Sequence, residues 1–187
     1  MAGPTLSQLV LVRHGESTWN ELKLVQGQSD ASLLTEEGRA QARAVAVTLR
    51  QQRFDAILAS DLWRAIETAE ILGDAMNLPV ETAIALRERS FGLFEGRPLA
   101  HLTPLLSGIE HGQVVNDLAH PERGETLRAL QERSGAFVEH LRHSRPNQRL
   151  LLVTHGGTIR AIRAHCAGIT MMGLPWDRVA NCSVWNV

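Results

Sequence analysis

Three short, uninterrupted apolar runs constrain the fold of this chain more than any other feature of its sequence. They cover Leu9 to Val12, Ala56 to Ala59 and Leu150 to Val153, and each is followed directly by polar residues. An apolar run of this length without alternation is typical of a strand that is buried on both faces. We therefore expect a largely parallel sheet with helices on both sides.

Amphipathic segments separate these runs. The expected helices cover residues 35 to 52, the stretch from Ser60 or Asp61 as cap to Asn77, residues Glu125 to His143, and the stretch from Gly157 to about Cys166. Thr35 is placed to cap the first of them, and apolar residues recur on one face of each at helical spacing. Two further strands are expected at Pro79 to Leu86 and Val179 to Val187, and a short helix near residues 98 to 107.

This alternation predicts a three-layer α/β/α sandwich with a mostly parallel, mixed central sheet. The length of 187 residues predicts one domain, residues 1–187, because domains hold roughly 150 residues and no repeat or linker divides the chain. Hydrophobic residues make up 44% and charged residues 21%, as in ordinary globular proteins.

The charge balance argues against whole classes of partner. A formal net charge of -1 does not fit a general binder of nucleic acid or anionic membranes. Among the 19 basic residues Lys23 is the single lysine, and the arginines suit phosphate because guanidinium binds it through two parallel hydrogen bonds. No targeting or membrane-spanning segment is recognisable, and two cysteines fit a reducing compartment, so we expect a cytoplasmic protein.

Chemically capable side chains follow four of the predicted strands. Arg13 and His14 follow the first, Arg64 lies one helical turn after the second, Glu88 follows the third, and His155 follows the fourth. Because ligands bind beyond the carboxyl ends of parallel strands, we expect these groups to form one cationic pocket with a single acid. Gly156, at the start of a helix, adds backbone N–H groups that favour an anion.

Five blocks in this order resemble the histidine phosphatase superfamily, also called the phosphoglycerate mutase-like family. They are Leu11-Val12-Arg13-His14-Gly15-Glu16-Ser17-Thr18-Trp19-Asn20, Ser60-Asp61-Leu62-x-Arg64-Ala65-x-x-Thr68-Ala69, Leu86-Arg87-Glu88-Arg89-x-x-x-Gly92-x-x-x-Gly96, Gly124-Glu125-Thr126 and Val153-Thr154-His155-Gly156-Gly157. A single Arg-His-Gly is a weak signal, whereas the ordered set covers nearly the whole chain.

The resemblance implies a phosphoglycerate mutase-like fold and a phosphohistidine intermediate. His14 is then the nucleophile, Arg13, Arg64 and His155 surround the phosphoryl group, and Glu88 is the general acid. The resemblance further implies that Asn20, Gln26 and Gly27 contact phosphate or substrate. The roles of Glu16 and Glu125 stay open between structural hydrogen bonding and substrate contact.

Neither a metal nor a cofactor is expected. The other histidines, at positions 101, 111, 120, 140, 143 and 165, lack the spacing typical of zinc sites. The arginines supply the positive charge that Mg²⁺ supplies in other phosphoryl-transfer enzymes.

The segment from Leu99 to Glu122 separates two activities of this family. A mutase needs extra cations for the rest of its substrate, and this segment contains neither Arg nor Lys. We therefore expect a phosphomonoester hydrolase acting on a small phosphorylated metabolite, with phosphoglycerate mutase as the alternative and an idle phospholigand-binding module as the alternative of another class. The last strand has an edge suited to pairing, which leaves a homodimer open.

Overall fold

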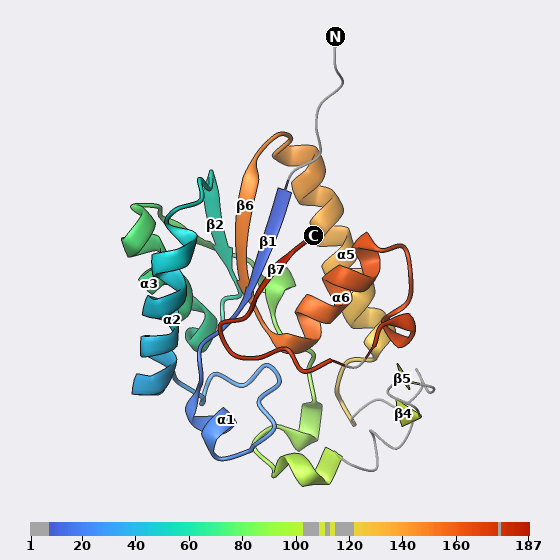
Figure 1. The fold of residues 1–187 in the computed structure, drawn as a ribbon. Coiled ribbons are helices and arrows are strands. Elements are labelled where there is room, and N and C mark those ends of the chain that lie inside the picture. The colour runs from blue at the N-terminus through green and yellow to red at the C-terminus, as the bar shows by residue number, and fades with distance from the viewer. Residues whose placement is uncertain (1–7, 103–108, 111–112, 115–121, 176) are drawn as a thin grey trace.

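The computed structural model describes residues 8–102, 109–110, 113–114, 122–175 and 177–187. Its centre is a five-stranded sheet in the order β3-β2-β6-β1-β7 (Figure 1). The strands are β1 (Gln8–Arg13), β2 (Ala56–Ala59), β3 (Val80–Thr82), β6 (Arg149–Thr154) and β7 (Val184–Asn186). The first four in this order are parallel and only β7 is antiparallel to its neighbour, which confirms the mixed, mostly parallel sheet.

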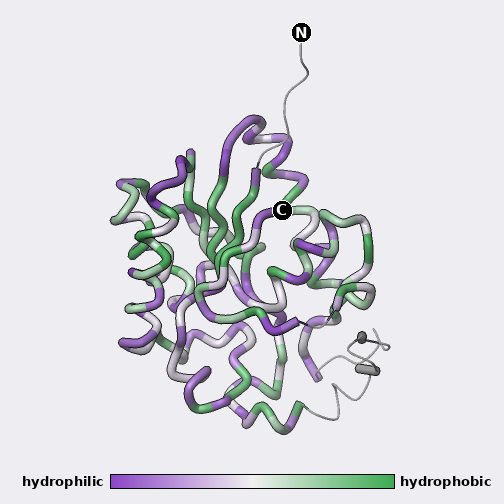
Figure 2. The backbone as a smooth tube through the Cα atoms, in the orientation of Figure 1, coloured by the Kyte–Doolittle hydropathy of each residue, from purple (hydrophilic) through white to green (hydrophobic). Residues whose placement is uncertain are grey.

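Two pairs of helices cover the two faces of the sheet (Figure 1). They are α2 (Glu36–Leu49) and α3 (Trp63–Met76) on one face, and α5 (Leu127–Ser144) and α6 (Gly156–Cys166) on the other. Leu9 and Leu11 of β1 pack toward α5 and α6, whereas Val10 and Val12 pack toward α2 and α3. Both faces of the central strands are thus apolar. Figure 2 colours these strands as hydrophobic, and the predicted sandwich is confirmed.

Shorter elements complete the described part of the chain. They are α1 (Thr18–Glu21), β4 (Ile109–Glu110), β5 (Gln113–Val114) and the 3₁₀ helices η1 (Ile84–Leu86), η2 (Gly92–Phe94), η3 (Leu99–Leu102) and η4 (Met171–Gly173). η3 lies within the helix predicted near residues 98 to 107; Pro98 precedes it, and residues 103–107 are outside the described ranges. Within those ranges, no helix has the length and apolar character that crossing a membrane requires.

The predicted helix ends are partly right. The hydroxyl of Thr35 accepts the Gly38 N–H at 3.0 Å and caps α2, as expected. The prediction that Ser60 or Asp61 caps α3 is wrong, because Leu62 occupies the capping position. Asp61 instead forms two hydrogen bonds of 2.7 Å with the guanidinium of Arg87.

Both edge strands are shorter than predicted. The strand expected from Pro79 to Leu86 ends at Thr82, where the chain turns into η1 and approaches the carboxyl end of the sheet. The strand expected from Val179 to Val187 begins only at Val184. The residues before it form a turn bonded to the end of β1, since the N–H of Cys182 donates to the carbonyl of Arg13 at 3.0 Å. Both departures carry loop residues over the end of the sheet.

Candidate active site

The pairing of β1 with β6 brings the first two chemical groups together. Arg13 lies opposite Thr154 in the parallel register, so His14 and His155 leave the sheet side by side. Their ring centroids are 5.1 Å apart, and the His14 N–H donates to the Thr154 carbonyl at 2.9 Å. The two predicted histidines therefore lie together at one end of the sheet.

His14 is held in one orientation by its own backbone. Its side chain is buried, and Nδ1 lies 2.7 Å from the carbonyl oxygen of Gly15. A carbonyl only accepts, so Nδ1 must carry the proton and the lone pair of the neutral ring lies on Nε2. Burial lowers the pKa of His14 well below 6.5, and the charges of Arg64 and Arg13 lower it further. The result is a neutral imidazole with a free ring nitrogen.

Arg64 is a fully buried cation beneath this site. It projects from the first turn of α3, where Nη1 donates to the Ser29 carbonyl at 2.8 Å and Nη2 to the Gly27 carbonyl at 2.7 Å. Burial lowers its pKa to about 10, so the guanidinium stays charged at neutral pH. Arg13 is fixed similarly by Val179, whose carbonyl accepts from Nη1 at 2.6 Å.

Several buried nitrogens around His14 make no hydrogen bond within the described structure. They are Nε of Arg13, Nε of Arg64 and both ring nitrogens of His155. Burial, followed by the charge of Arg64, lowers the pKa of His155 well below its ordinary value. Buried polar atoms are nearly always paired, so a cluster of unpaired nitrogens beside two cations is typical of an anion-binding site.

Glu88 reaches the same site from the loop after η1. Its two carboxylate oxygens accept the N–H of Arg89 at 2.8 Å and of Gly157 at 3.0 Å. A Cβ at Gly157 would lie 2.3 Å from Oε1 of Glu88, so a larger residue there would displace this carboxylate. This contact joins the acid to the first turn of α6, directly after His155.

An arginine that the sequence analysis did not single out holds the Glu88 loop. Arg133 of α5 donates to the carbonyls of Ala85 at 2.7 Å and Arg87 at 3.1 Å. It also forms two hydrogen bonds, of 3.0 and 2.9 Å, with the carboxylate of Glu125. Of the two roles considered for Glu125, these bonds support structural hydrogen bonding, with Arg133 as its partner. The eight-residue spacing of Glu125 and Arg133, near two helical turns, is the signal that relates them.

The predicted substrate contacts lie along one cleft of about 510 Å³ that opens from the site. Asn20, Gln26 and Gly27 line it together with Arg13 and Glu88. The amide oxygen of Asn20 accepts from Ser17 and Asn181, and that of Gln26 accepts from Ser17. Their amide NH₂ groups have no acceptor among the described residues. Gly156 lies beside Arg13, since a Cβ there would be 3.9 Å from Nε.

Glu16 and Asn181 also line the cleft. Glu16 lines it, and one carboxylate oxygen accepts the Thr35 hydroxyl at 2.9 Å, so both alternatives considered for Glu16 retain a basis. Asn181 donates to the carbonyl of His14 at 3.1 Å and also lines the cleft. It precedes the short β7 in an irregular loop, and no periodic pattern marks it.

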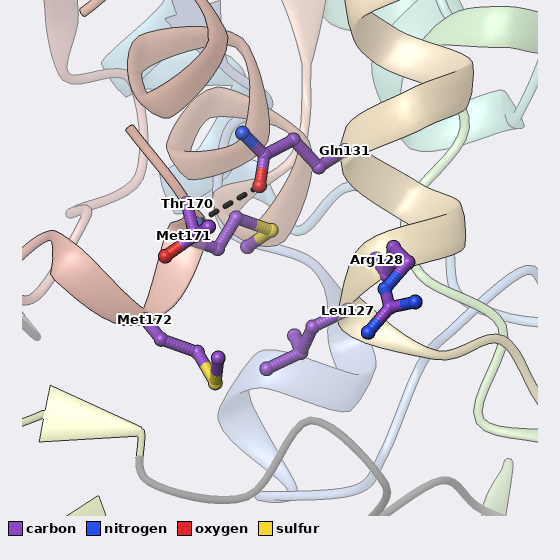
Figure 3. Close-up of a pocket in the computed structure, with 6 residues that line it drawn as sticks. All are labelled: Leu127, Arg128, Gln131, Thr170, Met171 and Met172. Carbon is purple, nitrogen blue, oxygen red and sulfur yellow. Dashed lines mark hydrogen bonds between the residues drawn. The ribbon is translucent and has the colours of Figure 1, made fainter. Parts of the chain in front are cut away.

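A second, smaller pocket lies between α5 and η4 (Figure 3). It is lined by Leu127, Arg128, Gln131, Thr170, Met171 and Met172. Both ends of the Gln131 amide bind backbone, with Nε2 donating to Ile169 at 2.7 Å and Oε1 accepting from Met171 at 2.9 Å. No carboxylate among the described residues lines this pocket. Arg13 and Glu88 line the larger cleft, so we place the candidate active site there.

Among the described residues, no three His, Cys, Asp or Glu side chains lie together in a way that can hold a metal ion. His111 and His120 lie outside those residues. His165 bonds Glu139 at 2.9 Å through Nε2, and Nδ1 of His143 lies 2.7 Å from the Glu139 carbonyl.

The chain is similar to known proteins over nearly its whole length. The family model described as "Histidine phosphatase superfamily (branch 1)" matches residues 9–187. A Yersinia enterocolitica protein named "Probable phosphoglycerate mutase GpmB" is 37% identical over 193 residues, which cover 96% of this chain and 84% of that protein. These matches confirm the family resemblance of the sequence blocks.

Several solved structures with similar folds carry the name of a phosphatase. A mycobacterial glucosyl-3-phosphoglycerate phosphatase in complex with VO3 has a TM-score of 0.85 at 30% identity, covering 96% of this chain and 90% of that one. A putative alpha-ribazole-5'-P phosphatase from Escherichia coli has a TM-score of 0.77 at 28% identity, covering 90% and 83%. A phosphoserine phosphatase from Entamoeba histolytica, at 24% identity and a TM-score of 0.79, shares the fold.

The tautomer and charge of His14 give a direct prediction. In ¹⁵N-histidine NMR, with the His14 signal identified by its loss in His14→Gln, Nδ1 should be protonated and Nε2 unprotonated. Because the pKa is lowered, the ring should stay neutral as pH falls through 6.5, where an ordinary imidazole is half protonated. A proton on Nε2, or titration near pH 6.5, would contradict the described geometry.

Proposed function

Because the chain belongs to the histidine phosphatase superfamily, we propose that it is a metal-independent phosphomonoester hydrolase that acts through a phosphohistidine intermediate. Its substrate is a small phosphorylated metabolite. One observation carries the proposal: a neutral His14 with a free Nε2 lies among unpaired nitrogens of Arg13, Arg64 and His155. A nucleophile within a cationic site that lacks internal partners is suited to receive a phosphoryl dianion.

In the first step His14 Nε2 attacks phosphorus in line with the ester oxygen. The N–P bond forms as the P–O bond breaks, and the electron pair leaves with the alkoxide. Arg13 and Arg64 neutralise the equatorial oxygens of the phosphoryl group, and the neutral ring of His155 donates a hydrogen bond to it. Glu88 acts as the general acid and protonates the departing alkoxide.

In the second step the same groups act on water. Glu88 is now a carboxylate, and its two oxygens lie where they accept the N–H groups of Arg89 and Gly157. It removes a proton from a water molecule that attacks phosphorus, and the N–P bond breaks. Inorganic phosphate is released and His14 returns to its neutral form. Glu88 now carries the proton that it donates in the next cycle.

Phosphate contacts outside this centre come from two directions. The NH₂ groups of Asn20 and Gln26 are available from the cleft, and Gly27 is held in place by its carbonyl bond to Arg64. On the other side, the first turn of α6 at Gly156 adds backbone N–H groups and the positive end of a helix dipole. The alcohol part of the substrate occupies the cleft, whose apolar lining is Trp19, Leu24, Val25, Phe91, Leu99 and Leu102.

Phosphoglycerate mutase activity is the second candidate, supported by the name of the 37% identical relative. The lack of Arg and Lys between Leu99 and Glu122 favours hydrolysis, as do the phosphatase names of the structures at 28% and 30% identity. An assay with 3-phosphoglycerate and a bisphosphate primer separates the two. Release of phosphate without formation of 2-phosphoglycerate supports the hydrolase.

We predict that activity requires no metal. Hydrolysis of p-nitrophenyl phosphate should be unchanged after treatment with EDTA, because arginines supply the charge that neutralises the phosphoryl group. Inorganic phosphate should inhibit competitively by occupying the same site. Loss of activity that a divalent cation restores would overturn the metal-free mechanism, and no hydrolysis of any phosphomonoester would leave a binding module as the better account.

Replacement of Glu88 should produce a loss that depends on the leaving group. Glu88→Gln should slow turnover of an alkyl phosphate by about 10² to 10⁴, the usual contribution of a general acid. The loss in single-turnover phosphoryl transfer from p-nitrophenyl phosphate should be much smaller, because p-nitrophenolate leaves without a proton. Equal losses for both substrates would assign Glu88 another role.

A further inference from the structure

Two cations at the cleft have no part in the reaction proposed above. Lys23 and Arg178 line the same cleft as Arg13 and Glu88. Both side chains are exposed, and neither forms a hydrogen bond or ion pair with any residue in the described part of the chain. Their charges are therefore free to meet a ligand.

Lys23 is unusual in both composition and conformation. It is the single lysine among 19 basic residues. Its φ is +54°, in the left-handed region that Gly, Asn and Asp occupy with less strain than lysine.

The backbone of Lys23 is fixed by a neighbouring segment. Its carbonyl accepts the N–H of Leu99 at 2.8 Å, and its own N–H donates to Asn20 at 3.2 Å. The adjoining Leu24 forms an isolated bridge with Pro98. The backbone that carries the ammonium group is thus fixed beside the cleft.

Arg178 lies on a loop that is held by hydrogen bonds on the N-terminal and the C-terminal side of this residue. Buried Arg160 donates to the Pro175 carbonyl at 2.9 Å, and Arg13 donates to the Val179 carbonyl at 2.6 Å. The charge of Arg178 contributes to the lowered pKa of Arg13, although burial is the larger cause. Arg178 therefore acts electrostatically on the phosphoryl-binding end of the cleft.

The other charged groups that line the cleft are already engaged. They are Arg13, which bonds Val179, Glu88, which accepts two backbone N–H groups, and Glu16, which accepts the Thr35 hydroxyl. The two uncommitted charges are thus both positive. A substrate whose only charge is the phosphoryl group gives them no partner.

We propose that Lys23 and Arg178 bind a second anionic group, a carboxylate or a phosphate, on the leaving group of the substrate. This inference rests on the proposed function, because it describes the alcohol that the enzyme releases. It selects phosphorylated acids and bisphosphates over neutral sugar or polyol phosphates. Both cations are specificity determinants rather than catalytic residues.

Steady-state kinetics of Lys23→Met and Arg178→Met test the proposal with three substrates. They are 3-phosphoglycerate, with a carboxylate, fructose 1,6-bisphosphate, with a second phosphate, and glycerol 3-phosphate, with a neutral alcohol. Each variant should lower kcat/KM about 3- to 20-fold for at least one anionic substrate, mainly through KM, as expected for one charged contact at a partly exposed site. Glycerol 3-phosphate should change less than about twofold.

The controls separate charge from structure. Lys23→Arg should retain most of the activity on the anionic substrate, and Arg43→Met, which removes an exposed cation of α2 outside the cleft, should leave all three substrates unaffected. A response of the carboxylate arm alone, or of the bisphosphate arm alone, supports the proposal and identifies the group. Equal losses on all substrates, or no loss on any, overturn it.

The single lysine permits a second test that needs no turnover. In His14→Asn protein, acetylation of the Lys23 amine followed by peptide mass spectrometry should be slowed at least threefold by 3-phosphoglycerate or fructose 1,6-bisphosphate and little by glycerol 3-phosphate. Wild-type protein that hydrolyses no phosphomonoester while Lys23 is protected would defeat the proposed function alone. Hydrolysis with no protection of Lys23 would defeat the inference alone.

Discussion

The site depends first on the parallel register of β1 and β6. With Arg13 opposite Thr154, the next residue of each strand is a histidine, and the two rings meet at 5.1 Å. A shift of one residue would turn every side chain of β1 to the opposite face and move His14 away from His155. Both strands are held by apolar residues on their two faces, with Leu11 packed toward one helix pair and Val12 toward the other. The packing that forms the core therefore also positions the two histidines.

The second constraint is the cost of burying charge around His14. Arg64 is completely buried, and bonds from two of its nitrogens to the carbonyls of Ser29 and Gly27 offset part of the desolvation. Burial and the neighbouring cations lower the pKa of both histidines. The protein thus keeps its imidazoles neutral beside arginines that remain charged, which is the state that nucleophilic attack on a phosphate dianion requires.

The site residues that directly follow strands were predictable. A buried apolar run that ends in a polar residue indicates a strand, and it also indicates the end of that strand at which a ligand binds. Arg13, His14 and His155 belong to this class, and Glu88 was placed by the family blocks. The residues that escaped prediction reach the site by other routes. Arg133 contacts the Glu88 loop because of the way α5 is packed against it. Asn181 lies in an irregular turn, where the sequence predicted the first half of the last strand. Such placements depend on tertiary packing that hydrophobic periodicity does not encode.

The account stands on transfer of the phosphoryl group to His14 Nε2. The most direct measurement is rapid-quench mass spectrometry of the protein mixed with p-nitrophenyl phosphate, quenched in base and digested, since phosphohistidine is labile in acid. The account predicts a phosphoryl group on the peptide that contains His14 within the first turnover, and its absence in His14→Asn. Turnover without any phosphorylated His14 peptide, or a phosphoryl group on another residue, would contradict it.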